Sequence, residues 1–106
     1  MKTEFIVIFI TASSFDEAEK IGKTLVEKRL APCVNIIRDV RSIFHWKGKV
    51  SDEKEVLLIA KSKRKNFEKI AEEVKRLHSY EVPEIIGLPI SMGSKNYLDW
   101  IEKESL

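Results

Sequence analysis

Cysteine, glycine and proline are scarce in this chain of 106 residues, which has one cysteine, four glycines and three prolines. The single cysteine, Cys33, excludes a disulfide within the chain and fits a reducing compartment. Because the glycines are well separated, no glycine-rich phosphate loop can form. One cysteine and two histidines exclude a thiolate-rich zinc site, and the CxxC, HExxH and GxSxG motifs are absent. We therefore expect a protein that is not an enzyme.

The chain also lacks a long hydrophobic run and a strong excess of one charge. The apolar stretch near the N-terminus is far shorter than the ~20 residues that span a bilayer, and it lacks the character of a secretory signal. Lysine and arginine number 19 against 17 aspartate and glutamate, a net charge of +2 that gives no nucleic-acid footprint. We therefore expect a cytoplasmic protein without membrane or nucleic-acid partners.

Hydrophobic patterning predicts a strand, then a helix, at the start of the chain. Residues 4–11, "EFIVIFIT", are β-branched and aromatic, which suits a strand buried on both faces. Ser14 and Glu17 have the spacing of a capping box, so a helix should begin there and end before Pro32.

The middle of the chain predicts a long β-ribbon and a second helix. Residues 33–46 and 49–61 read as two strands joined by a turn at Gly48. The polar start of the returning strand, "SDEKE", fits either a bulge or a solvent-exposed ribbon. An apolar stripe over 63–78 then predicts a helix, with Ser62 as its cap.

The end of the chain completes a known arrangement of strands and helices. Residues 84–90 predict a strand, with Pro89 favouring a sheet edge, and Ser94 should cap a short final helix. The order βαββαβ plus a helix predicts an α+β, ferredoxin-like fold with an antiparallel sheet. Since such a sheet has one open face and the ribbon outreaches its neighbours, we expect other copies of the chain to cover them.

The segment "HSYEVPEIIGLP" holds the main candidates for a site. His78 should end the second helix, where the helix dipole favours a histidine and its ring could simply bond a free carbonyl group. The alternative is a metal site, because Tyr80, Glu81 and Glu84 follow closely and imidazole with carboxylate suits copper or zinc.

Other candidate residues lie on the predicted ribbon. Phe44 and Trp46 share a strand face, either in an oligomer interface or as the wall of a pocket. Lys61 could reach an anionic ligand or could be a solvated strand end. Cys33 is expected to be a small buried residue, with metal binding as the minor alternative.

Five segments in order, "RLAPCVNI", "FHWKGKV", "EVLLIAKS", "LHSYEVPEIIGLPI" and "YLDWI", together resemble the CutA family, named for divalent-cation tolerance. The resemblance covers nearly the whole chain and implies one CutA-like domain over 1–106. It implies a homotrimer similar in plan to PII-type signalling proteins, located in the cytoplasm, that binds copper or another divalent cation without an organic cofactor. No catalytic activity is implied.

The resemblance carries over to the metal ligands only in part. Copper-binding members have a cysteine where this chain has Ile10, and two histidines where it has Leu77 and His78. We therefore predict His78 and Glu81 as metal ligands. The alternative is a PII-like signalling module that binds a small anionic metabolite or a partner protein in inter-subunit clefts. The residues predicted to line those clefts are Trp46, Lys61 and Tyr80.

Overall fold

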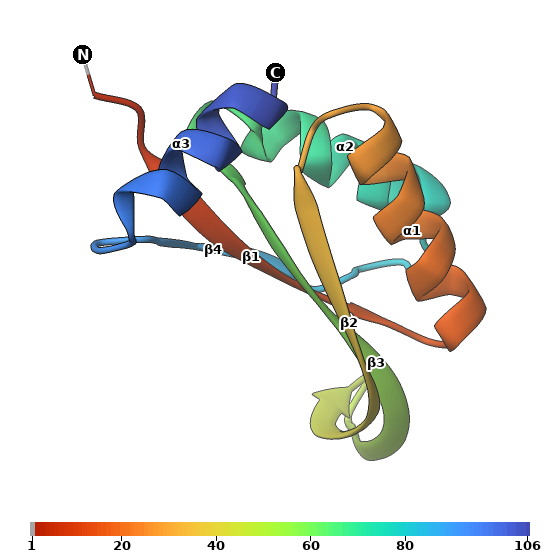
Figure 1. The fold of residues 1–106 in the computed structure, drawn as a ribbon. Helices are drawn as coiled ribbons and strands as arrows, with labels where there is room; N and C mark the ends of the chain where they lie inside the picture. Colours follow the sequence, from red (N-terminus) through yellow and green to blue (C-terminus); the bar gives the residue numbers. More distant parts are fainter. Residues whose placement is uncertain (1) are drawn as a thin grey trace.

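The computed structural model describes residues 2–106, and its elements follow the predicted order (Figure 1). Its four strands form one antiparallel sheet in the order β2-β3-β1-β4, which confirms the α+β, ferredoxin-like prediction with a C-terminal helix. The elements are β1 (Phe5–Ala12), α1 (Phe15–Glu27), β2 (Cys33–Trp46), β3 (Lys49–Lys63), a 3-10 turn (Arg64–Asn66), α2 (Phe67–Leu77), β4 (Ile85–Pro89) and α3 (Lys95–Glu104).

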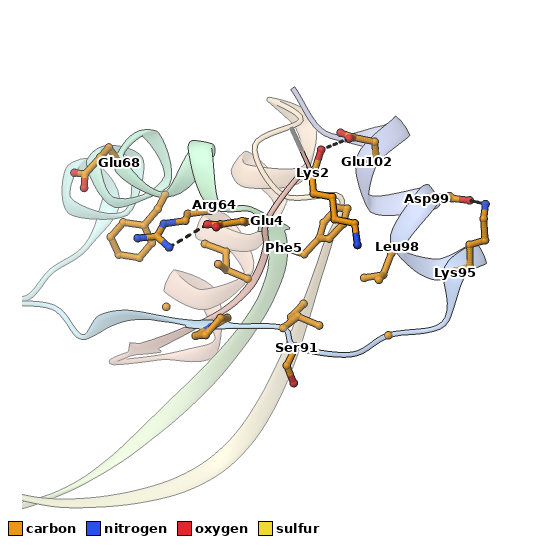
Figure 2. A pocket seen from close by; sticks show the side chains of 17 residues that line it. Lys2, Glu4, Phe5, Arg64, Glu68, Ser91, Lys95, Leu98, Asp99 and Glu102 are labelled. Atoms are coloured by element: carbon orange, nitrogen blue, oxygen red, sulfur yellow. Dashed lines mark hydrogen bonds and ion pairs between the residues drawn. The ribbon is translucent and has the colours of Figure 1, made fainter.

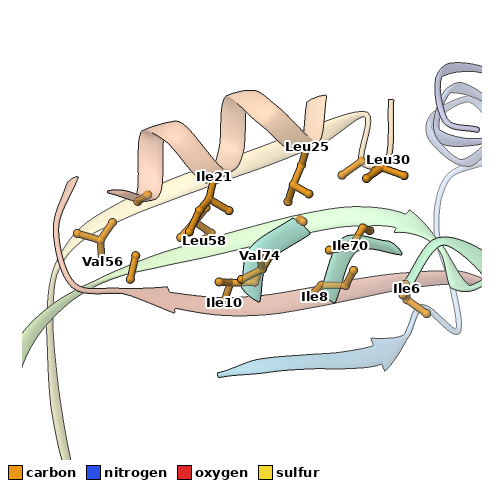
Figure 3. Packing of buried hydrophobic residues seen from close by; sticks show 14 residues of the cluster. Ile6, Ile8, Ile10, Ile21, Leu25, Leu30, Val56, Leu58, Ile70 and Val74 are labelled. Carbon is orange, nitrogen blue, oxygen red and sulfur yellow. The ribbon is translucent and has the colours of Figure 1, made fainter. Parts of the chain in front are cut away.

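The hydrophobic core lies between one face of the sheet and the helices α1 and α2 (Figure 3). Along β1, Ile6, Ile8 and Ile10 point into this core and are buried, as the two-residue period of a strand requires. Val7 and Phe9 point the other way and are only half-buried. The prediction that β1 is buried on both faces is therefore wrong for the single chain.

The uncovered side of the sheet is strongly apolar, and we call it the open face. It consists of the side chains that alternate with the core residues along the four strands. Several of them are half-buried or exposed large hydrophobic residues, and Ile86 is 50% exposed. The apolar members of the open face are Val7, Phe9, Ile37, Leu57, Ile59, Ile86 and Leu88.

Helix α1 begins at the predicted cap, with one change in its bonding. The Ser14 hydroxyl oxygen accepts a hydrogen bond from the Glu17 backbone N–H at 3.2 Å, which confirms the cap. The Glu17 carboxylate, however, accepts from the backbone N–H of Ser13 at 2.8 Å and not from that of Ser14. The capping box therefore reaches one residue further back and leaves Glu17 beside the end of β1.

The β2–β3 ribbon extends away from the helices and makes the chain elongated, with dimensions of 45 × 25 × 23 Å (Figure 1). Lys47 and Gly48 both have positive φ at its tip, which suits a tight two-residue hairpin turn. "SDEKE" pairs regularly with β2 and is mostly exposed, with Glu55 buried at its end. The irregularity lies in β2, between Ile37 and Val40. There Asp39 has a φ of 61°, and the Arg38 guanidinium lies 3.6 Å from the centre of the Phe15 ring.

The second helix begins later than the sequence predicts. Strand β3 continues to Lys63, and the 3-10 turn separates it from α2, which begins at Phe67. Ser62 is therefore a buried strand residue whose hydroxyl donates to the Leu30 carbonyl oxygen, and its prediction as a helix cap is wrong. An ion pair holds α3 against the end of β3, because the buried Lys63 ammonium pairs with Glu102 of α3 at 2.5 Å.

Candidate functional site

His78 lies where α2 ends, and both of its ring nitrogens are engaged. Its Nε2 lies 2.6 Å from the Thr11 carbonyl oxygen, and its Nδ1 accepts a hydrogen bond from the Tyr80 backbone N–H at 3.0 Å. Because a carbonyl oxygen can only accept, these bonds assign the proton to Nε2 in a neutral ring. The side chain is fully buried. His78 therefore ties the turn after α2 to the end of β1.

Glu17 holds the same turn from the N-terminal end of α1. One carboxylate oxygen accepts from the Ser79 backbone N–H at 2.6 Å, and the other accepts from the Ser13 N–H and hydroxyl. Burial acts to raise the pKa of Glu17, but the hydrogen bonds from Ser13 and Ser79 outweigh it and lower the pKa. The sequence signal for this role was only the capping box, which did not reveal the contact with Ser79.

Tyr80 reaches from the turn to β3, where its hydroxyl donates to the Glu55 carboxylate at 2.7 Å. Burial, this hydrogen bond and the negative charges of Glu55, Glu17 and Glu53 raise the pKa of Tyr80. Burial and the charge of Glu55 also raise the pKa of Glu84. The turn therefore lies in a markedly acidic environment, and no sequence signal had singled out Glu55.

The predicted metal ligands are near each other in sequence but have different surroundings. His78 is buried beneath the turn, whereas Glu81 is exposed on it. In residues 2–106, no three or more histidine, cysteine, aspartate or glutamate side chains gather to hold a metal ion. Coordination by the Nδ1 of His78 would require release of the Tyr80 N–H. Ile10 is part of the hydrophobic core, and Leu77 packs against that core. The two positions where copper-binding members carry further ligands are therefore used here for core packing.

A cleft of about 550 Å³ lies beside the turn, between it and the ribbon. Two of the three residues predicted for a ligand cleft, Trp46 and Tyr80, line it together with Phe44 and Glu81. Lys61 does not line it. Its ammonium instead donates to the Asn35 side-chain oxygen, on the open face. Within one chain the structure therefore brings Trp46 and Tyr80 together at the cleft and leaves Lys61 outside it.

A larger cavity of about 1290 Å³ opens near the start of β1, between β4, α2 and α3 (Figure 2). Its floor is apolar and includes Phe5 and Leu98, while ion pairs such as Arg64–Glu4 at 3.0 Å lie along its rim. The sequence offered no signal for it, because its residues come from four separate segments. Within residues 2–106, the helices are too short or too polar to cross a membrane.

Comparisons with known proteins agree on one family. The family model described as "CutA1 divalent ion tolerance protein" matches residues 6–104. The chain is 46% identical over 99 residues to the divalent-cation tolerance protein CutA of Thermus thermophilus, covering 93% of this chain and 96% of that protein. It is 39% identical over 95 residues to the human protein CutA, covering 90% of this chain and 53% of the human protein.

Solved structures give the same result. The Thermus thermophilus divalent cation tolerance protein superposes with a TM-score of 0.94 at 45% identity, covering 96% of this chain and 99% of that chain. CutA1 from Oryza sativa gives a TM-score of 0.95 at 34% identity, with coverage of 97% and 94%. The chain therefore belongs to the CutA1 divalent ion tolerance protein family.

Proposed function

We propose that this protein takes part in tolerance of divalent cations by binding them, copper among them, as a homotrimer and without catalysing a reaction. The observation that carries the proposal is the family match over residues 6–104, a family described by divalent ion tolerance. The apolar open face supports the assembly, because a contiguous apolar surface of this kind is typical of protein–protein contact. A closed ring of copies would cover it.

His78 and Glu81 remain the proposed metal ligands. Nδ1 of His78 is the ring nitrogen that can offer a lone pair to a cation. The Tyr80 N–H, which now donates a hydrogen bond to Nδ1, must first move away. Because two ligands make a weak site, we expect a neighbouring copy to supply others. A proton competes with the metal for imidazole, so binding should weaken as the pH falls.

Calorimetric titration with Cu²⁺ tests the site through its exposed ligand. Glu81→Gln removes an exposed carboxylate that makes no hydrogen bond or ion pair within residues 2–106, so the fold should be preserved. Glu72→Gln, at an exposed position on α2, is the matched control. We expect weaker copper binding by Glu81→Gln and unchanged binding by Glu72→Gln. Equal affinity of all three proteins would remove Glu81 from the site.

A second candidate function rests on the cleft beside the turn. Trp46 and Tyr80 line a cleft of about 550 Å³, a volume typical of small-molecule sites. We propose, as the alternative, a PII-like signalling module that binds a small anionic metabolite or a partner protein there. A thermal-shift screen with nucleotides and other metabolites separates the two: stabilisation by copper alone favours the first function, and stabilisation by a metabolite, lost in Trp46→Ala, favours the second.

A further inference from the structure

Glu55 is a buried carboxylate without a cation. It is 6% exposed, and the Tyr80 hydroxyl is its hydrogen-bond partner. Within residues 2–106, no lysine, arginine or histidine forms an ion pair with it. Burying a charge is costly unless it is paired, so this arrangement calls for a positive partner.

The surroundings of Glu55 increase this need. Glu55 points to the same side of β3 as Leu57, so it lies at one end of the open face. Glu84 precedes β4 and lies near enough to Glu55 for the negative charge of Glu55 to raise the pKa of Glu84. The negative charge of Glu53 likewise raises the pKa of Tyr80, which bonds to Glu55. This end of the open face, formed by Glu53, Glu55 and Glu84, is the acidic end.

Lys61 lies on the same strand and the same face, six residues further along β3. At ~3.3 Å per residue the two backbone positions are about 20 Å apart, beyond the reach of a lysine side chain. The Lys61 ammonium donates instead to the neutral side chain of Asn35. Leu57 and Ile59 lie between Glu55 and Lys61, so the open face has an acidic end, an apolar middle and a basic end.

We propose that, in the assembled protein, Lys61 of the partner subunit enters the acidic end of the open face and pairs with Glu55. This inference rests on the proposed assembly and names the contact that orients it. A surface with opposite charges at its two ends matches a second copy in a head-to-tail arrangement, which closes into a ring when the rotation allows. The apolar middle is then covered by the same contact.

The pairing also accounts for the position of Lys61 outside the cleft within one chain. Trp46 and Tyr80 line that cleft, and Tyr80 bonds to Glu55. A lysine delivered to Glu55 from the neighbouring copy would lie next to Tyr80. The partner's lysine would then add a third positive charge to Lys47 and Lys54, which line this cleft within one chain.

Charge reversal tests the contact. Glu55→Lys places two lysines at each contact and Lys61→Glu places two glutamates there, so each single variant should associate at least about tenfold more weakly than the wild type. The double variant Glu55→Lys/Lys61→Glu restores an opposite pair at every contact and should recover association. Because the two residues are too far apart to meet within one chain, such recovery reports a contact between copies. Lys69→Glu, exposed on α2, is the matched control.

Sedimentation over a range of chain concentrations gives the readout, and circular dichroism checks that each variant is folded. Where a reversal does not fold, Glu55→Gln and Lys61→Gln replace it in a double-mutant cycle, and Glu55→Gln should weaken association of the wild type but not of Lys61→Gln. Single variants that associate like wild type, or a double variant no better than the two single effects combined, would overturn the pairing alone. A wild-type protein that sediments as one chain would overturn the assembly itself.

Discussion

Replacing His78 with alanine should destabilise the fold, whatever its effect on metal. The ring connects the Thr11 carbonyl oxygen and the Tyr80 N–H, at 2.6 and 3.0 Å, and it is fully buried. Alanine leaves both backbone groups without a partner, and each such loss costs about 1–3 kcal/mol when the group stays buried. Since the turn is partly exposed and water can reach one of them, we expect a total loss of about 2–4 kcal/mol.

Urea unfolding at a fixed chain concentration measures this loss, and the chain offers its own control. His45 lies on the exposed ribbon, so His45→Ala should change the free energy of unfolding by no more than about 0.5 kcal/mol. A His78→Ala protein as stable as His45→Ala would refute the structural role assigned to the ring. The result also bears on metal titrations, because a loss of copper binding in His78→Ala would then include a loss of structure.

Three further predictions concern the core, an acidic anchor and the ribbon tip. Leu58 is fully buried, so Leu58→Ala should lower the free energy of unfolding by about 3–5 kcal/mol in the same urea assay. The pKa of Glu17 is lowered by folding, so its stabilisation is present above the ordinary carboxyl pKa of 4.5 and is lost as the pH falls through the lowered value; urea midpoints between pH 7 and pH 3 should fall less steeply in Glu17→Gln. Gly48 has a φ of 78°, so Gly48→Ala should cost about 1–2 kcal/mol in thermal unfolding, whereas Ser51→Ala nearby should cost little.

Local signals predicted most of the fold. The Ser14–Glu17 spacing located the start of α1, Gly48 located the ribbon turn, and Pro89 indicated an edge strand, all of which the structure confirms. Ser62 failed as a cap because pairing with β1 carries the strand past it, a tertiary effect that a local pattern does not contain.

The site was less predictable, because its contacts join distant segments. His78 was expected either to bond a carbonyl group at the helix end or to bind metal, and its ring bonds Thr11, 67 residues away in sequence. Glu55 belongs to a polar run that was expected to form either a bulge or a solvent-exposed ribbon, yet its side chain is buried and accepts a hydrogen bond from the Tyr80 hydroxyl. The position of Lys61 outside the cleft depended on strand register, which spacing alone does not supply.

We propose that the protein binds divalent cations as an assembly of three chains. Native mass spectrometry of the wild-type protein with and without Cu²⁺ tests it most directly, because the mass reports the number of chains and of bound ions together. We expect a species of three chains that gains copper when the ion is added and loses it again on acidification. A single-chain mass at micromolar concentration, or three chains that take up no divalent cation, would contradict it.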